Sequence, residues 1–261
     1  MIRYALGGVL LACASLPALA GGAPIDKTDT PSMRFEWRGE KQADLCDSMC
    51  PRWISAVGPV TARTPHDFEV FAQQKDVRGA TLALESEGGS VVGTIELGRA
   101  LRRLDITTTV GKTVVASAAD GSTTTALLPT AACESMCGFV LLGGVRRYVP
   151  PEARILVHQI WLAKKRERSE TASYTADEIV VVERDIGSLA RYTIEMGGGI
   201  ELLEAALRVP PWQPLYQLSR DEIQRVGLNN VDHLFKAKPD GVATNAALAA
   251  TAVSAPPGFR P

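Results

Sequence analysis

The sequence predicts an α/β protein, because apolar runs of strand length alternate with segments of helical periodicity. Residues 53–60 and 79–85 have the apolar character of buried strands, and each is followed by a helix-like segment, at 64–74 and 91–103. The chain has 261 residues, of which 46% are hydrophobic, and this is enough to form the core of one large domain. We therefore expect strands and helices to alternate within a single domain.

The composition argues against a nucleic-acid partner. The formal net charge is -1, so the chain lacks the basic excess of a protein that binds nucleic acid or an anionic surface. Only 6% of the residues are aromatic, which also disfavours stacking platforms for single strands. The remaining partners are proteins, peptides or small molecules.

The first twenty residues have the features of a signal peptide. Arg3 gives a positive start, residues 5–16 form an apolar run too short to span a bilayer, and Ala-Leu-Ala at 18–20 is a cleavage site of the A-x-A type. An alternative, a lipoprotein processed at Cys13, leaves an unusually short apolar region. No other run is apolar for long enough to span a membrane. We therefore predict a signal peptide at 1–20 and a periplasmic or secreted mature protein without a membrane segment.

Four cysteines remain after this cleavage, and an even number in an exported chain indicates disulfides. They are Cys46, Cys50, Cys133 and Cys137. Three pairings are possible. Each close pair is spaced i, i+4, which in a regular helix holds the Cβ atoms about 5–6 Å apart, wider than the roughly 3.5–4.5 Å of a disulfide. A local bridge therefore needs one cysteine outside the helix, and Cys133 precedes the helix start. Zinc is the alternative, but C-x-x-C spacing is absent and no histidine is close to either pair, so we predict disulfides and no metal site.

The rest of the chain divides into a leader at 21–45, a domain at 46–236 and a disordered Ala/Pro-rich tail at 237–261. Residues 114–130 are small, polar and poorly periodic, which predicts a strand and a mobile loop over the site. Residues 164–175 are charged, as in a flexible excursion or lid. The further elements predicted are strands at 106–110, 146–149 and 154–158, and helices at 135–142, 177–196, 200–207 and 220–226.

Ser135 and His158 are the candidate catalytic residues. Acyl transfer needs a nucleophile, a base within hydrogen-bond reach and donors for the oxyanion. Ser135 stands in a turn of small residues at a helix start, and His158 stands at a strand end. The backbone N–H groups of Gly88 and Met136 can supply the oxyanion donors. Each side chain also has an ordinary explanation, a helix cap for Ser135 and a satisfied histidine for His158. Their combination with the double-glycine turn upstream favours catalysis.

Four segments of the chain resemble the landmarks of a known family. They read SEGGSVVGTIELGRALRR at 86–103, SMCGFVLLGG at 135–144, RRYVPPEARILVHQ at 146–159 and LSRDEIQRVGL at 218–228. They are similar to the proteolytic subunit of Clp-type proteases and its exported bacterial relatives, over about residues 53–232.

This resemblance implies a Clp/crotonase fold, a spiral of stacked ββα units with two roughly perpendicular sheets and helices outside. It also implies that Ser135 is the nucleophile, that His158 is the base, and that Gly88 and Met136 line the oxyanion hole. The substrate would be a peptide or protein, and no cofactor is required. Relatives form rings or stacked oligomers, often through a long helix, so the helix at 177–196 can mediate a homo-oligomer.

Two positions depart from the family pattern. Glu87 replaces the usual proline before the glycines. The triad acid of the family falls just before the last helix, where residues 211–217 read PWQPLYQ and contain no acid. Losing the orienting acid of a triad can lower turnover by roughly 10⁴-fold. Gln213 or a backbone carbonyl can hold the imidazole instead, whereas Asp221 is expected on the outer, solvated helix.

Three functions are compatible with these residues. The first is an exported serine hydrolase, a peptidase before an esterase. The second is a non-catalytic binding or assembly protein that keeps the fold, as the missing acid, Glu87 and the cysteines beside Ser135 suggest. The third, a crotonase acting on coenzyme A thioesters, fits least well, because that cofactor is cytoplasmic and Ser135 and His158 would be unexplained.

Overall fold

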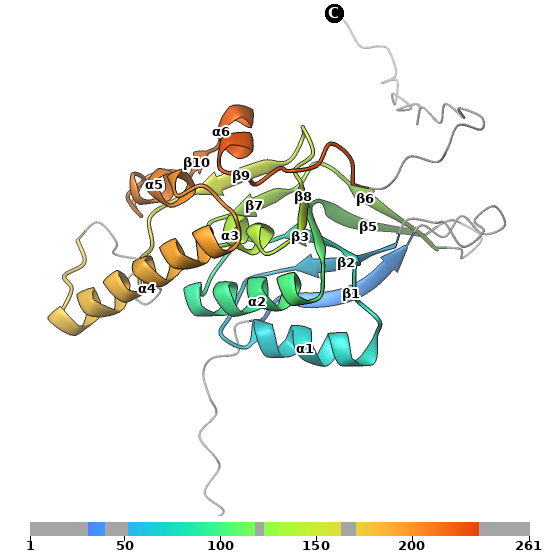
Figure 1. The fold of residues 1–261 in the computed structure, drawn as a ribbon, viewed down its shortest axis with the longest axis horizontal. Helices are drawn as coiled ribbons and strands as arrows, with labels where there is room; N and C mark the ends of the chain where they lie inside the picture. The colour runs from blue at the N-terminus through green and yellow to red at the C-terminus, as the bar shows by residue number, and fades with distance from the viewer. Residues whose placement is uncertain (1–30, 40–51, 118–122, 163–170, 235–261) are drawn as a thin grey trace, which may run out of the picture. The chain divides into compact units, whose positions relative to one another are not determined.

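The computed structural model describes residues 31–39, 52–117, 123–162 and 171–234 (Figure 1). The predicted signal peptide at 1–20, the tail at 237–261, and Cys46 and Cys50 lie outside these residues. In the described part, helices and several β-sheets alternate along the chain. The prediction of a mixed α/β fold is therefore confirmed.

The larger sheet has five strands in the order β1-β2-β3-β4-β8, with β1 antiparallel to β2 and the other neighbours parallel. The strands are β1 (Arg34–Gly39), β2 (Arg52–Val57), β3 (Thr81–Glu85), β4 (Thr107–Val110) and β8 (Arg146–Tyr148). Helices α1 (Thr64–Gln74) and α2 (Val91–Arg103) connect β2 to β3 and β3 to β4, and they lie side by side (Figure 1). All four residues of β4 are buried, as expected for a central parallel strand covered by helices.

Helices α1 and α2 span the predicted residues because their start signals are local. Pro65 stands in the first turn of α1. Backbone N–H groups in a first turn have no acceptor within the helix, so proline, which lacks an N–H, is well tolerated there. Ser90 caps α2, and its Oγ accepts a hydrogen bond of 3.1 Å from the Gly93 N–H. Gly88 and Gly89 therefore lie in the short turn between the carboxyl end of β3 and the start of α2.

The smaller sheet has three strands in the order β10-β9-β7, with β9 parallel to β7 and antiparallel to β10. The strands are β7 (Ala132–Glu134), β9 (Arg154–Val157) and β10 (Tyr216–Gln217). A parallel bridge between Ser86 and Cys133 joins β7 to the residue that follows β3, and so connects the two sheets. Helix α3 (Cys137–Leu142) follows β7, and all of its residues are buried. The turn between β7 and α3 thus lies beside the double-glycine turn.

Residues 114–130 differ from the prediction of a strand and a loop. Among their described residues, 114–117 belong to β5 (Lys112–Ser117) and 123–128 form β6 (Thr123–Leu128), and the two strands pair antiparallel. Trp53 Nε1 donates a hydrogen bond of 2.9 Å to Thr113 Oγ1, which anchors the hairpin to the larger sheet. No residue of either strand is fully buried. The alternation that marks a half-buried strand is therefore weak in the sequence.

Residues 34–39 also differ from the prediction, which placed them in a leader. They form the edge strand β1, whose side chains are exposed or only partly buried. Phe35 packs against Phe68 of α1, with 5.1 Å between ring centroids, and Met33 just before the strand is buried. The strand has polar residues among its apolar ones, so it lacks the continuous apolar run by which a buried strand is predicted from sequence.

Helix α4 (Ala176–Glu195) is buried only near its C-terminal end. The buried residues are Leu189, Tyr192 and Thr193. The Tyr192 hydroxyl donates a hydrogen bond of 2.9 Å to the Phe139 carbonyl of α3, and burial raises the pKa of Tyr192 above its usual range. In the first turns Ile179 and Val180 are 47% and 60% exposed. The face of this helix that belongs to the core is therefore confined to its C-terminal end.

Two arginines hold the C-terminal end of α3. Arg102 donates to the carbonyls of Leu142 and Gly144 at 2.8 and 3.1 Å. Arg147 donates to Gly144 at 3.0 Å and to Gly227 after α6 at 2.6 Å. Burial lowers the pKa of Arg147 to about 10, so this side chain remains a cation at neutral pH. These donors satisfy carbonyls that a helix end leaves without partners.

Two short helices complete the described fold, α5 (Glu201–Leu207) and α6 (Arg220–Arg225). Ser219 and Glu222 form a capping box at the start of α6, as the sequence predicts for Ser219. Asp221 is exposed on α6. Among the described helices, none is long and apolar enough to cross a membrane.

Candidate active site

Ser135 occupies the turn between β7 and α3, and its backbone is strained. Its φ is +54°, and among the described non-glycine residues only Asp105 shares a positive φ. The left-handed region costs an L-residue about 1–2 kcal/mol, and such outliers gather at functional sites. Ser135 precedes α3 rather than belonging to it, although the sequence predicts it as the first helical residue. Its side chain is only 7% exposed.

Hydrogen bonds on the strand side hold this conformation. The Ser135 N–H donates to the Leu156 carbonyl of β9 at 2.7 Å. One residue earlier, the Glu134 N–H donates to the Ser86 carbonyl at 2.8 Å. The end of β7 is therefore fastened on both sides, to β9 and to the chain leaving β3. Ser135 leaves the sheet in a defined direction.

Gly88 lies directly against the Ser135 turn. Its φ is +84°, and a Cβ added to it would lie 2.6 Å from the Glu134 carbonyl oxygen, 2.6 Å from the Met136 nitrogen and 2.8 Å from Ser135 Cβ. No real side chain fits at these distances. Glycine is thus required here both for its backbone conformation and for the close approach of the two turns.

The two predicted oxyanion donors differ in how they are used. The Gly88 N–H donates to Ser86 Oγ at 3.1 Å. For the Met136 N–H, no acceptor is found among the residues that the structure describes. Both amides lie beside Ser135, because Gly88 is within contact of the Met136 nitrogen. Met136 therefore offers a ready donor, whereas Gly88 must exchange a hydroxyl partner for an oxyanion.

A disulfide between Cys133 and Cys137 brackets Ser135. Cys133 is in β7 and Cys137 is the first residue of α3, so the local bridge has one cysteine outside the helix, as the spacing requires. Their Cα atoms are 5.2 Å apart, within the usual range for a disulfide. Both cysteines are fully buried. The disulfide predicted as one of the possible pairings is present.

His158 follows β9 directly, and its ring is held from two sides. Nδ1 lies 2.7 Å from the carbonyl oxygen of Gln159. A carbonyl oxygen can only accept, so this contact requires the proton on Nδ1 and leaves Nε2 as the basic nitrogen. The ring also packs against Trp161, with 4.2 Å between centroids. His158 is partly buried.

The topology brings Ser135 and His158 to the same sheet edge. β7 and β9 are parallel neighbours with Glu134 opposite Leu156, so each residue follows the carboxyl end of its strand. Neighbouring strands lie about 4.8 Å apart. Among the contacts within the described residues, none joins Ser135 Oγ to the His158 ring. The base is therefore adjacent to the nucleophile but not yet bonded to it, as in many free enzymes.

The segment before α6 lies beside His158 but carries no acid. The Gln159 N–H donates to the Val209 carbonyl at 2.8 Å, and β10 pairs with β9 through Tyr216 opposite Val157. Gln213 is exposed in this segment, and its role as an orienter of the imidazole remains a prediction. In the helix that follows, the carboxylate of Glu222 accepts from the Ser219 N–H, and this contact lowers the pKa of Glu222. The contact to Nδ1 that the structure shows comes from the Gln159 carbonyl.

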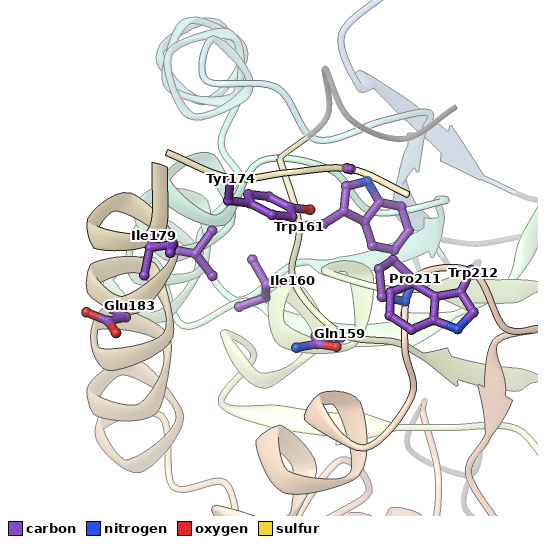
Figure 2. A pocket seen from close by; sticks show the side chains of 10 residues that line it. Gln159, Ile160, Trp161, Tyr174, Ile179, Glu183, Pro211 and Trp212 are labelled. Carbon is purple, nitrogen blue, oxygen red and sulfur yellow. The ribbon is translucent and has the colours of Figure 1, made fainter. Parts of the chain in front are cut away.

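A cavity of about 380 Å³ lies next to His158 (Figure 2). Its walls come from the chain after β9, from the first turns of α4 with the residues just before them, and from the segment after α5. They are Gln159, Ile160, Trp161, Ala172, Tyr174, Ile179, Val182, Glu183, Pro211 and Trp212. Figure 2 shows the carboxylate of Glu183 turned away from the three aromatic side chains. The cavity is thus largely apolar and aromatic on the side nearest His158.

Sequence reasoning missed the Gln159 carbonyl and the aromatic walls. A backbone acceptor has no signature in the residue types. Trp161, Tyr174 and Trp212 are separated by up to 51 positions, and only the fold brings them together. No group of three or more His, Cys, Asp or Glu side chains in the described residues is placed to hold a metal ion.

No protein-family model matches the sequence, and no curated protein matches it significantly. The case for a function therefore depends on the residues of the site.

Proposed function

We propose that this chain is a serine hydrolase with a Clp/crotonase-type fold, and most specifically a peptidase. The observation that carries the proposal is the Ser135 turn, a serine at φ +54° pressed against Gly88 beside the strand that delivers His158. Strain of this kind persists only where the surrounding structure enforces it. A helix cap, the ordinary role for such a serine, does not need a positive φ.

The reaction is acyl transfer through a covalent intermediate. Ser135 Oγ attacks the acyl carbon while its proton moves to His158 Nε2. The carbonyl oxygen becomes an oxyanion that accepts from the Met136 and Gly88 N–H groups. The imidazolium then gives its proton to the leaving amine, and a water activated by the same nitrogen hydrolyses the acyl-enzyme. His158 must first move into hydrogen-bond contact with Ser135 Oγ.

The base is oriented by a neutral group. The Gln159 carbonyl selects the tautomer with the proton on Nδ1, which is the tautomer that catalysis needs. A carbonyl stabilises an imidazolium less than a carboxylate does, because hydrogen bonds between charged groups are roughly twice as strong. We therefore expect a slow enzyme with the correct geometry.

The cavity beside His158 suits an apolar or aromatic side chain of a peptide. Its volume of about 380 Å³ is at the small end of ligand pockets. Trp161 belongs both to the cavity wall and to the stack on the His158 ring. A substrate side chain bound in the cavity would thus contact Trp161, the residue that packs against the His158 ring.

The compartment and assembly are part of the same proposal. The Cys133–Cys137 disulfide supports a periplasmic or secreted location, because disulfides persist in oxidising compartments. The exposed Ile179 and Val180 of α4 support a homo-oligomer formed through this helix. These exposed side chains also favour the second candidate, an assembly protein that uses the fold without catalysis.

The test is labelling by a fluorophosphonate probe, which reacts with activated serines. The purified mature protein should label on Ser135, and both Ser135→Ala and His158→Ala should lose labelling while keeping the wild-type circular dichroism spectrum. Ser117→Ala and His66→Ala, at exposed positions of β5 and α1, are the matched controls and should label like the wild type. Digestion of peptides with a single aromatic or small side chain beside the scissile bond then separates peptidase from esterase activity.

Two results decide between the candidates. Absence of labelling in correctly folded protein would reject the hydrolase. A self-association constant that is unchanged in Ser135→Ala but weakened in Val180→Asp would then favour the assembly protein.

A further inference from the structure

We propose that the Cys133–Cys137 disulfide is a positioning element of the active site, which keeps Ser135 and the Met136 N–H in their reactive arrangement. This inference rests on the proposed hydrolase function. It assigns the two cysteines a part in the reaction, in addition to any contribution to folding.

The bridge spans the residues that carry the chemistry. Cys133 and Cys137 are separated by four positions, and the three residues between them are Glu134, Ser135 and Met136. The nucleophile and the unoccupied amide donor thus lie within one small covalent ring. One end of the ring is in β7, and the other is the first residue of α3.

The hydrogen bonds around Ser135 hold the strand side more firmly than the helix side. Up to Ser135, the chain is fastened to Leu156 at 2.7 Å and to Ser86 at 2.8 Å. After it, the Met136 N–H has no acceptor among the described residues, and the Ser135 carbonyl accepts a long bond of 3.3 Å from Gly138. The Met136 carbonyl accepts from Phe139 and Val140 at 3.1 and 3.0 Å, but these bonds join it to α3 and not to β7. The disulfide supplies the missing connection between the end of β7 and the start of α3.

Without the disulfide, the Ser135 backbone is expected to relax in one direction. An L-residue at φ +54° relaxes toward negative φ when its neighbours allow it. Helix α3 has only six residues, so its own hydrogen bonds enforce its first turn weakly. Such a relaxation turns the peptide between Ser135 and Met136, and it moves the hydroxyl and the amide donor together. Nucleophilic attack by Ser135 and stabilisation of the oxyanion by the Met136 N–H would therefore both become weaker.

The experiment compares the wild-type protein with Cys133→Ala/Cys137→Ala, which removes both thiols. Labelling of Ser135 by the fluorophosphonate is resolved into a reversible binding constant and a maximal labelling rate. The proposal expects the maximal rate to fall about 10- to 100-fold, because small misplacements of reacting groups have effects of this size. The binding constant and the near-ultraviolet dichroism of the buried tyrosine should change little, since the cavity and the core lie outside the bridged ring.

Cys46→Ala/Cys50→Ala is the matched control, because it also removes two cysteines but leaves the Ser135 turn intact. It should label at the wild-type rate. If the first double variant does not fold, the same rates are measured on the wild-type protein before reduction with a phosphine, after reduction, and after reoxidation. A rate that falls on reduction and returns on reoxidation supports the proposal.

Two outcomes would overturn the inference, and they differ from failure of the proposed function. An unchanged maximal rate in a folded, bridge-free protein would show that the disulfide does not position Ser135. A loss of rate that only parallels global unfolding would show that the bridge is a structural staple. If the wild-type protein itself does not label, the hydrolase proposal fails instead.

Discussion

The turn of Ser135 and the segment of His158 lie side by side, but the protein holds them in different ways. Ser135 is buried, its N–H donates to Leu156 of β9, and a disulfide brackets it. His158 is partly buried, and two of the contacts of its ring come from nearby residues of the chain, Gln159 and Trp161. The nucleophile thus stands in a covalently bridged turn, whereas the base stands directly after a strand.

This difference has a mechanistic meaning. A strained nucleophile needs a rigid surround, because otherwise the backbone relaxes. A base that must take a proton, turn and return it can be held less tightly, and free enzymes often lack the final contact. The first three predictions below each change one of the two regions.

The largest change in labelling rate is expected for Gly88→Ala, which disturbs the turn of Ser135. The new methyl group would meet the backbone on both sides of Ser135, and the residue would also keep a φ of +84°. The maximal fluorophosphonate labelling rate should fall at least about 100-fold. Gly79→Ala is the matched control, since Gly79 has φ +70° but nothing within 4 Å of the added Cβ. Equal rates in the two variants would show that Gly88 does not shape the site.

The second effect is a faster labelling rate, expected for Leu215→Asp beside the His158 segment. Tyr216 lies opposite Val157, and one further step of the antiparallel register places residue 215 opposite His158. Opposite residues have Cβ atoms about 4.5–5.5 Å apart, so a carboxylate there can reach Nδ1. A charge-assisted hydrogen bond of about 1.5–3 kcal/mol in the transition state would raise the labelling rate roughly 10- to 100-fold.

Leu215→Asn is the control for this gain, because it has the same shape without the charge. It should label at or below the wild-type rate. A pH profile of labelling measured for both variants separates an effect on the imidazole from an effect on folding. If Asp and Asn behave alike, the carboxylate does not reach the base.

A smaller effect is expected for Trp161→Ala, which removes the ring that packs on His158. Aromatic packing contributes about 0.5–1.5 kcal/mol, so the maximal labelling rate should fall about 2- to 10-fold. Trp212→Ala, from the same cavity, should instead weaken peptide binding and leave the maximal rate nearly unchanged. Steady-state kinetics with an aromatic peptide measure the two effects as changes in kcat and KM. The reverse pattern would contradict the assignment of Trp161 to the base.

The smallest effect concerns the ion pair of Arg99 and Glu195, which ties the buried end of α4 to α2 at 2.6 Å. The hydrogen bond from Arg99 lowers the pKa of Glu195. Its stabilisation is therefore present above the pKa of the unfolded carboxyl and is lost as the pH falls through the lower pKa of the folded state. Both side chains are about 40% exposed, so the contribution is less than about 0.5 kcal/mol.

Urea unfolding of the wild type and Glu195→Gln measures this contribution. The difference in free energy of unfolding should be small at pH 7 and should decrease as the pH is lowered. Glu201→Gln on α5, for which no ion pair is found among the described residues, is the control and should show no such difference over this pH range. A difference that grows on acidification would contradict the stated sign.

Much of the fold was predictable because its signals are local. Pro65 and Ser90 mark the starts of α1 and α2, and the capping box at Ser219 marks α6. The strand β1 and the β5–β6 hairpin were not predictable in the same way. Their residues are partly exposed on both faces, so neither a continuous apolar run nor a clear alternation marks them.

For the candidate site, residue types were predictable and conformations were not. Ser135, His158, Gly88, Met136 and the two cysteines are visible as a pattern in the sequence. The positive φ of Ser135 and the carbonyl contact to Nδ1 depend on backbone positions that no residue type encodes. The walls of the cavity come from three separate segments, which only the packing of α4 and β10 around β9 brings together.

By itself, the sequence determined most strands and helices of the larger sheet, with β1 as the exception, and which side chains are available for acyl transfer. Local capping, apolar periodicity and residue chemistry suffice for this. Only the tertiary structure decided that the turns of Gly88 and Ser135 press against each other and that Ser135 follows the strand beside His158. The reason is that strand order and register are set by burial of the whole core, and a residue one position further along a strand faces the opposite side of the sheet.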